Sequence, residues 1–192
     1  DGAVAEMATR MKSTALDLIS LADTVRGFER GVVDGTELKQ YDVRSVVEDV
    51  VGDLRGEYPD IEFDIEADDS PTVMATGQLE LALSELGDNA ARHGESTVRF
   101  EVTTADDGRI AVHVHDSGPG LPTTERRVLE AGRETPLEHG SGLGLWMVNW
   151  IVTNLGGTVT TSVEEGTTVS ILLPPATEVD GRLTSAVSGR ST

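Results

Sequence analysis

Residues 140–145 read Gly-Ser-Gly-Leu-Gly-Leu and run directly into the apolar segment 146–152. The alternate glycines leave the backbone unshielded, and the apolar run behind them is typical of a buried helix that begins near Leu143. The first amides of a helix lack internal partners and lie at the positive end of its dipole, which favours phosphate binding over bare glycines. Alternating glycines also form ordinary turns, and the Lys-Ser/Thr ending of a P-loop is missing, so this stretch alone leaves both interpretations open.

The composition limits the classes of partner. The 192 residues carry 34 acidic and 15 basic side chains, a formal net charge of -19 that argues against nucleic-acid binding. There is no cysteine, which excludes disulfides and thiolate metal sites. Only Lys12 and Lys39 are lysines, and an acidic, lysine-poor chain is typical of salt-loving microbes, so a halophilic origin is our hypothesis.

No apolar run approaches the length of a membrane span, and no signal-like start is visible. We therefore expect a soluble, cytoplasmic segment without direct membrane contact, although the parent protein could be anchored in a membrane.

The first 33 residues are predicted to form one long helix with a heptad-like apolar seam that is interrupted at Thr14. A coiled-coil-like dimerisation helix would cover that seam with a partner, and packing on its own domain is the alternative. After a short extended piece over 36–41, Asp42 is expected to cap a second helix over 43–57, which Tyr58-Pro59 closes.

The rest of the chain alternates between strand and helix patterns. We expect strands over 61–66, 72–75, 98–103, 110–115, 158–163 and 167–173, and helices over about 77–92 and 143–154. Strands joined by hairpins, with helices in a separate layer, indicate an α+β fold: a two-layer sandwich with a mixed, mostly antiparallel sheet and helices on one face. The predicted divisions of the chain are a coiled-coil-like dimerisation helix (1–35), the α+β domain (36–175) and a C-terminal tail (176–192).

Segment 85–93 forms a polar patch on a predicted helix. Four-residue spacing sets Glu85 and Asn89 on one face, with Arg92 and His93 one turn further on. An amide oxygen suits Mg²⁺ among phosphates, a carboxylate can orient water, and a guanidinium can pair with phosphate oxygens. The alternative is a solvated helix face.

Segment 116–120, Asp-Ser-Gly-Pro-Gly, follows a strongly apolar strand. A carboxylate at the buried end of such a strand can accept a hydrogen bond from an exocyclic amine such as that of adenine, and an ordinary acidic turn is the alternative. The three polar or glycine-rich stretches, 85–93, 116–120 and 140–145, occur in one chain and in this order. Their joint occurrence favours the functional interpretation of each stretch over its structural alternative.

In that order, segments 85–93, 116–120 and 140–145 resemble the N, G1 and G2 boxes of the GHKL ATPase superfamily. Its Bergerat fold is shared by gyrase, heat-shock chaperone ATPases and sensor histidine kinases. The histidine-kinase branch is the most similar, because Gly156-Gly157-Thr158 and the closing run 166–174 also match its catalytic domain. Residues 16–50 resemble the second helix of its dimerisation domain and the connection onward.

The resemblance implies ATP and Mg²⁺ as cofactors. Asn89 would coordinate Mg²⁺, and Glu85, where many histidine kinases have asparagine, would assist the metal or the accepting imidazole. Asp116 would bind the adenine amine, while Arg92 and His93 would contact phosphates or ribose. The remaining implied contacts to the nucleotide are those of Gly118, Gly120, Gly140, Gly142, Leu143, Gly144 and Leu145.

The resemblance also implies a lid over residues 121–139, with Leu129 as its anchor in place of the usual phenylalanine. None of the four histidines lies on the N-terminal helix in a phosphoacceptor context, so the acceptor is expected outside this segment. His113 and His115 alternate on one strand, where we expect them to pack rather than bind metal, because a third ligand is missing. The four histidines are His93, His113, His115 and His139.

These features indicate the ATP-binding catalytic part of a two-component sensor histidine kinase, which transfers the γ-phosphoryl group of ATP to a histidine. The implied partners are the phosphoacceptor domain, a response regulator and a second copy of the parent protein. Two alternatives stay open: a stand-alone GHKL regulatory module or anti-sigma-type serine kinase acting on a partner protein, and a structural dimerisation unit with a vestigial site.

Overall fold

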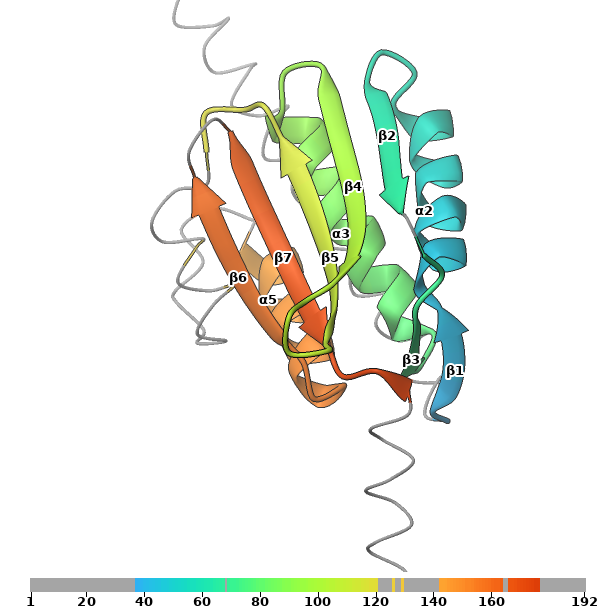
Figure 1. Ribbon diagram of the computed structural model, residues 1–192. Helices are drawn as coiled ribbons and strands as arrows, with labels where there is room; N and C mark the ends of the chain where they lie inside the picture. The colour runs from blue at the N-terminus through green and yellow to red at the C-terminus, as the bar shows by residue number, and fades with distance from the viewer. Residues whose placement is uncertain are drawn as a thin grey trace, which may run out of the picture.

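The computed structural model describes residues 37–67, 69–120, 126, 129, 142–163 and 166–176 (Figure 1). The predicted helix over 1–33 and most of the predicted lid lie outside these residues. The helices are α2 (Val43–Glu57), α3 (Gln78–His93) and α5 (Gly142–Asn154). The strands are β1 (Lys39–Asp42), β2 (Glu62–Ala67), β3 (Thr72–Ala75), β4 (Thr97–Thr104), β5 (Ile110–Asp116), β6 (Thr158–Val163) and β7 (Thr167–Leu173).

The main sheet has five strands in the order β2-β4-β5-β7-β6. β2 and β4 run parallel, and every other neighbouring pair runs antiparallel. The helices α2, α3 and α5 cover one face of this sheet (Figure 1). This architecture confirms the predicted two-layer α+β fold with a mixed, mostly antiparallel sheet.

Strand alternation decides which side chains enter the core. Val98, Phe100 and Val102 of β4 point toward the helices and are buried, while the residues between them are half-buried on the other face. On β5 the same alternation buries Val112 and Val114, and it continues to the last residue of the strand, Asp116. A carboxylate therefore ends a row of apolar side chains on the helix-covered face.

Helix α2 has the predicted bounds. The Asp42 side chain accepts a hydrogen bond from the Ser45 amide at 3.0 Å, which caps the first turn. At the other end the Tyr58 amide donates to the Leu54 carbonyl at 2.8 Å, and Pro59 follows. Leu54 packs toward Gly87 of α3, where an added Cβ would also lie 2.9 Å from Cζ of Phe100. The missing side chain at Gly87 thus lets α3 lie close to both α2 and the sheet.

The predicted extended piece over 36–41 contains most of β1, which forms a separate two-stranded sheet with the predicted strand over 72–75. β1 pairs antiparallel with β3, with Tyr41 opposite Val73. The Val43 amide donates to the Pro71 carbonyl at 3.0 Å, and Val73 bridges to Pro175. This pairing joins segments that lie on either side of α2 and β2, a long-range contact that local sequence patterns do not encode.

Candidate nucleotide-binding site

The carboxylate of Asp116 is fixed where β5 ends. Its side chain is only 7% exposed, and Oδ1 accepts a hydrogen bond from the Gly118 amide at 2.8 Å. A Cβ on Gly94 would lie 3.2 Å from Cβ of Asp116, and one on Gly166 would collide with its carbonyl. The glycines let three chain segments close around Asp116, whose other carboxylate oxygen remains an acceptor for a ligand amine.

Gly118 also brings the loop after β5 against the end of α3. A Cβ at this position would overlap the backbone carbonyl of His93. The G1-like segment and the last turn of the N-box helix are therefore in direct contact, as the prediction of one composite site requires.

Glu85 and Gly144 connect the second pair of predicted segments. α3 and α5 pack on each other, and the Glu85 carboxylate occupies the space where a side chain of Gly144 would lie. Gly144 and Leu145 are buried in the first turns of α5, with Leu145 only 1% exposed. The N-terminal end of α5, which favours negative charge, thus lies beside the polar face of α3.

Arg92 is held by two residues that the sequence did not single out. Its Nε donates to the Tyr58 hydroxyl and to Asp88 Oδ1, both at 3.1 Å, and lies 3.0 Å from Asp88 Oδ2. The Tyr58 hydroxyl in turn donates to Asp88 Oδ1. Burial, together with the bond to Asp88, raises the pKa of Tyr58 to about 12, although the Arg92 bond opposes this shift.

The predicted lid anchor is buried. Leu129 is 0% exposed and belongs to the hydrophobic core, and its carbonyl accepts a hydrogen bond from Asn149 Nδ2 of α5 at 2.5 Å. Nearby in sequence, Arg126 Nε donates to Thr161 Oγ1 of β6 at 3.2 Å. Leu129 is therefore fixed both in the core and against α5.

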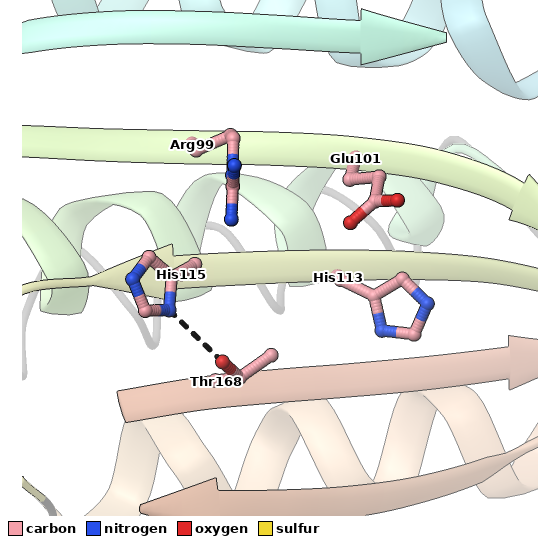
Figure 2. Close-up of a pocket in the computed structure, with 5 residues that line it drawn as sticks. All are labelled: Arg99, Glu101, His113, His115 and Thr168. Carbon is pink, nitrogen blue, oxygen red and sulfur yellow. Dashed lines mark hydrogen bonds between the residues drawn. The ribbon is translucent and has the colours of Figure 1, made fainter. Parts of the chain in front are cut away.

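The outer face of the sheet carries a shallow cavity of about 160 Å³ that is separate from these residues (Figure 2). His115 Nδ1 pairs with Thr168 Oγ1 at 3.0 Å, and His113 Nδ1 with Ser170 Oγ at 2.7 Å. In Figure 2 the two remaining ring nitrogens point in opposite directions along the strand. His113 Nε2 also lies 3.4 Å from Thr103 Oγ1, so hydroxyl groups of the neighbouring strands contact both rings. The cavity is lined by Arg99, Glu101, His113, His115 and Thr168.

The structure brings most of the predicted site residues to one end of the helix-covered face. Glu85, Asn89, Arg92 and His93 lie on the second half of α3. Gly142, Leu143, Gly144 and Leu145 form the start of α5, and Gly118 and Gly120 follow Asp116. Gly140 lies outside the described residues.

Residues 75–177, more than half of the chain, match the family described as "Histidine kinase-, DNA gyrase B-, and HSP90-like ATPase". The chain belongs to this family, and its N-, G1- and G2-like segments fall within the matched range.

Curated relatives of the chain are signal-transduction kinases. The chain is 35% identical over 132 residues to the signal transduction histidine-protein kinase/phosphatase MprB of Mycobacterium leprae, a match that covers 60% of this chain and 24% of that protein. It is 30% identical over 173 residues to the MprB of Mycobacterium sp. strain KMS, covering 82% and 33% respectively. The chain thus spans between a quarter and a third of the length of these relatives.

Solved structures show the same fold. A mycobacterial sensor histidine kinase MprB structure matches 72% of this chain and 99% of its own, with 27% identity and a TM-score of 0.62. Full-length ShkA in complex with AMPPNP matches 83% of this chain and 36% of its own, with 26% identity and a TM-score of 0.66. The fold is therefore that of a histidine-kinase ATPase domain.

The helices and the acidic and histidine side chains of the described residues limit two further features. None of the helices that the structure describes is long and apolar enough to cross a membrane. Among the same residues, no three histidine, aspartate or glutamate side chains are grouped to hold a metal ion.

Proposed function

We propose that this chain is the ATP-binding catalytic part of a two-component sensor histidine kinase. The observation that carries the proposal is Asp116, a buried carboxylate at the end of an apolar row, against the helix that bears Glu85 and Asn89. Family membership and the kinase relatives support the same conclusion.

Asp116 would recognise the adenine base. Its Oδ1 is occupied by the Gly118 amide, which fixes the carboxylate plane, and the second oxygen can accept from the exocyclic amine. A hydrogen bond between a buried carboxylate and an amine is stronger than in water and selects a base that carries such a donor. Gly118 and Gly120 carry no side chain that would hinder approach of the base and sugar.

The phosphates would lie between α3 and the start of α5. The amides of the first turn of α5, from Gly142 to Leu145, are suited to phosphate oxygens, and Arg92 and His93 would add side-chain contacts. Asn89 and Glu85, one helical turn apart, offer the oxygen ligands that Mg²⁺ takes together with phosphates, so the residues present fit this ion. When bound, Mg²⁺ neutralises charge on the phosphoryl oxygens.

The reaction would be an in-line phosphoryl transfer. A ring nitrogen of the acceptor histidine attacks the γ-phosphorus with its lone pair as the bond from phosphorus to the β–γ bridging oxygen breaks. The electron pair of the broken bond leaves with ADP. This chain contributes positioning and charge neutralisation, because it holds the nucleotide while the acceptor comes from another part of the parent protein or from a second subunit.

The partners follow from the same proposal. The phosphorylated histidine would pass its phosphoryl group to a response regulator, and the parent protein would form a homodimer through the predicted N-terminal helix.

Calorimetric titration of the chain with AMP-PNP and Mg²⁺ tests the nucleotide site. We expect binding that requires Mg²⁺, is lost in Asn89→Ala and Asp116→Asn, and is retained in Asp64→Asn, which removes an equal charge from an exposed position of β2. Unchanged binding in both site variants would refute the assignment.

A second measurement identifies the reaction. The chain is incubated with Mg·ATP and a fragment that carries the acceptor helix of the parent protein, and the phosphorylated residue is tested for acid stability. An acid-labile phosphohistidine is expected. An acid-stable phosphoserine on a partner protein would instead support an anti-sigma-type serine kinase.

A further inference from the structure

Tyr58, Asp88 and Arg92 form a hydrogen-bonded cluster, here called the Tyr58 cluster, that connects the end of α2 to the N-box helix α3. Tyr58 caps the C-terminus of α2, and Asp88 and Arg92 are one turn apart on α3. The tyrosine hydroxyl donates to Asp88 and accepts from Arg92, so it uses both of its hydrogen-bonding roles. The Asp88 carboxylate accepts hydrogen bonds from both Tyr58 and Arg92.

The contacts of Arg92 within the Tyr58 cluster all involve Nε. One nitrogen reaches the Tyr58 hydroxyl at 3.1 Å and the two Asp88 oxygens at 3.1 and 3.0 Å. A guanidinium has five N–H donors in a planar fork, and only one of them is on Nε. The four donors on the two terminal nitrogens are therefore not needed to form this cluster.

Arg92 lies on the same side of α3 as Glu85, about two helical turns further along. Seven residues separate it from Glu85, so with 3.6 residues per turn the two differ by only about 20° around the helix axis. Burial lowers the pKa of Arg92, but the hydrogen bond to Tyr58 and the charge of Asp88 outweigh it and raise the pKa, with a smaller contribution from the charge of Glu85. Glu85 in turn lies against Gly144 of α5. Arg92 is thus part of the Tyr58 cluster and lies two turns along α3 from Glu85, on the side of the helix from which Glu85 contacts the start of α5.

We propose that Tyr58 and Asp88 are positioning residues that hold Arg92 by its Nε and so present its terminal nitrogens to the phosphates of the bound nucleotide. This inference rests on the proposed function, since it assumes a nucleotide between α3 and α5. It adds a residue from outside the three boxes to the nucleotide site.

Pre-organisation is the physical reason for an effect on affinity. An unrestrained arginine loses the freedom of four side-chain torsions when it binds a phosphate, whereas an arginine already fixed at Nε loses less. The hydroxyl of Tyr58 stays protonated over the physiological range, because its pKa is about 12, so it can donate to Asp88 without interruption. Under this inference, Tyr58 and Asp88 affect nucleotide affinity through the position of Arg92 and not through contacts of their own.

The first test compares the affinity of the chain for Mg·AMP-PNP by calorimetry in wild type, Tyr58→Phe and Asp88→Asn. Each variant keeps the size of the side chain and weakens the hold on Arg92. We expect affinity to fall about fivefold, as for the loss of one hydrogen bond between Arg92 and a phosphate. Tyr41→Phe is the matched control, since Tyr41 is the other tyrosine of the chain and is also half-buried. It should bind like wild type.

The second test asks whether the effect passes through Arg92. In an Arg92→Ala background, Tyr58→Phe should cause no further loss of AMP-PNP affinity, and binding of adenosine, which lacks phosphates, should be equal in all these variants. A loss of the same size with and without Arg92, or a loss that extends to adenosine, would show a merely structural role and refute the inference.

Two other outcomes are decisive. Unchanged or tighter AMP-PNP binding in a folded Tyr58→Phe variant would refute the positioning role while leaving the proposed function intact. If the folded wild-type chain bound no AMP-PNP, the proposed function itself would fail, and the inference with it.

Discussion

The carboxylate of Glu85, on α3, lies beside Gly144, in the first turn of α5, in the space that a side chain at position 144 would need. A Cβ at Gly144 would overlap Oε1 of Glu85 and would also crowd its Cδ and Cγ. The glycine therefore allows a carboxylate of the N-box helix to reach the N-terminal end of α5, where the helix dipole stabilises negative charge.

This contact predicts the effect of Gly144→Ala. The added methyl group conflicts with a flexible side chain and not with backbone, so the variant should fold, but Glu85 must leave its position. We expect the affinity for Mg·AMP-PNP to fall about tenfold, equivalent to about 1.4 kcal/mol. Calorimetry measures the affinity, and circular dichroism checks the fold.

A double variant provides the control for Gly144→Ala. When Glu85→Ala has already removed the carboxylate, the methyl group at position 144 has nothing to displace. Glu85→Ala with Gly144→Ala should then bind no more weakly than Glu85→Ala alone. A further loss in the double variant would mean that Gly144 acts through another contact.

Two helical glycines should respond oppositely to alanine. A Cβ at Gly87 would collide with Leu54 and lie 2.9 Å from Phe100, whereas nothing lies within 4 Å of one at Gly52. Gly87→Ala should lower the free energy of unfolding by about 1–3 kcal/mol through overpacking. Gly52→Ala should raise it by about 0.5–1 kcal/mol through helix propensity. Urea unfolding measures both, and changes of the same sign would contradict the packing described for α3.

The fold could be predicted wherever the determining signals are local. The bounds of α2 follow from the Asp42 cap and from Pro59, and the burial of Asp116 follows from the alternation along β5. The pairing of β1 with β3 could not be predicted in this way, because α2 and β2 lie between Tyr41 and Val73 in the sequence. Long-range contacts of this kind depend on the tertiary structure.

The same distinction applies to the candidate site. The three boxes identify Glu85, Asn89 and Asp116 because each motif is contiguous in sequence. Tyr58 carries no such signal, since Tyr58-Pro59 indicates only the end of a helix. Its contact with Arg92 appears once α2 and α3 are packed, and the remaining assignments of nucleotide contacts stay predictions.

The Tyr58 cluster predicts a pH dependence. The pKa of Tyr58 rises from 10.0 to about 12 in the folded chain, mainly because burial disfavours the phenolate. The folded state therefore holds this proton more tightly than the unfolded state. The resulting stabilisation is complete below about pH 10 and is lost as the pH rises through about 12.

Ultraviolet titration can isolate this group, because the chain has only two tyrosines. In Tyr41→Phe, the near-ultraviolet absorbance change of phenolate formation reports Tyr58 alone, while circular dichroism monitors folding. We expect a midpoint near 12 in the native chain and near 10 in denaturant. A native midpoint near 10 would show that the hydroxyl is not buried in the Tyr58 cluster.

The net charge of -19 predicts that salt stabilises the fold, as the hypothesis of a halophilic origin requires. At about 1 M salt the Debye length falls to roughly 3 Å, which screens repulsion between surface carboxylates.

One such repulsion is local, because Glu66 of β2 lies directly opposite Glu101 of β4. Glu101→Gln should therefore raise the free energy of unfolding in dilute buffer by about 0.2–1 kcal/mol and reduce its dependence on KCl. Glu80→Gln is the control, because Glu80 is exposed in the first turn of α3, where the helix dipole favours its charge and no carboxylate lies three or four residues away along the helix; it should not raise the stability. Equal stability of the wild-type chain in dilute buffer and in molar KCl would refute the hypothesis.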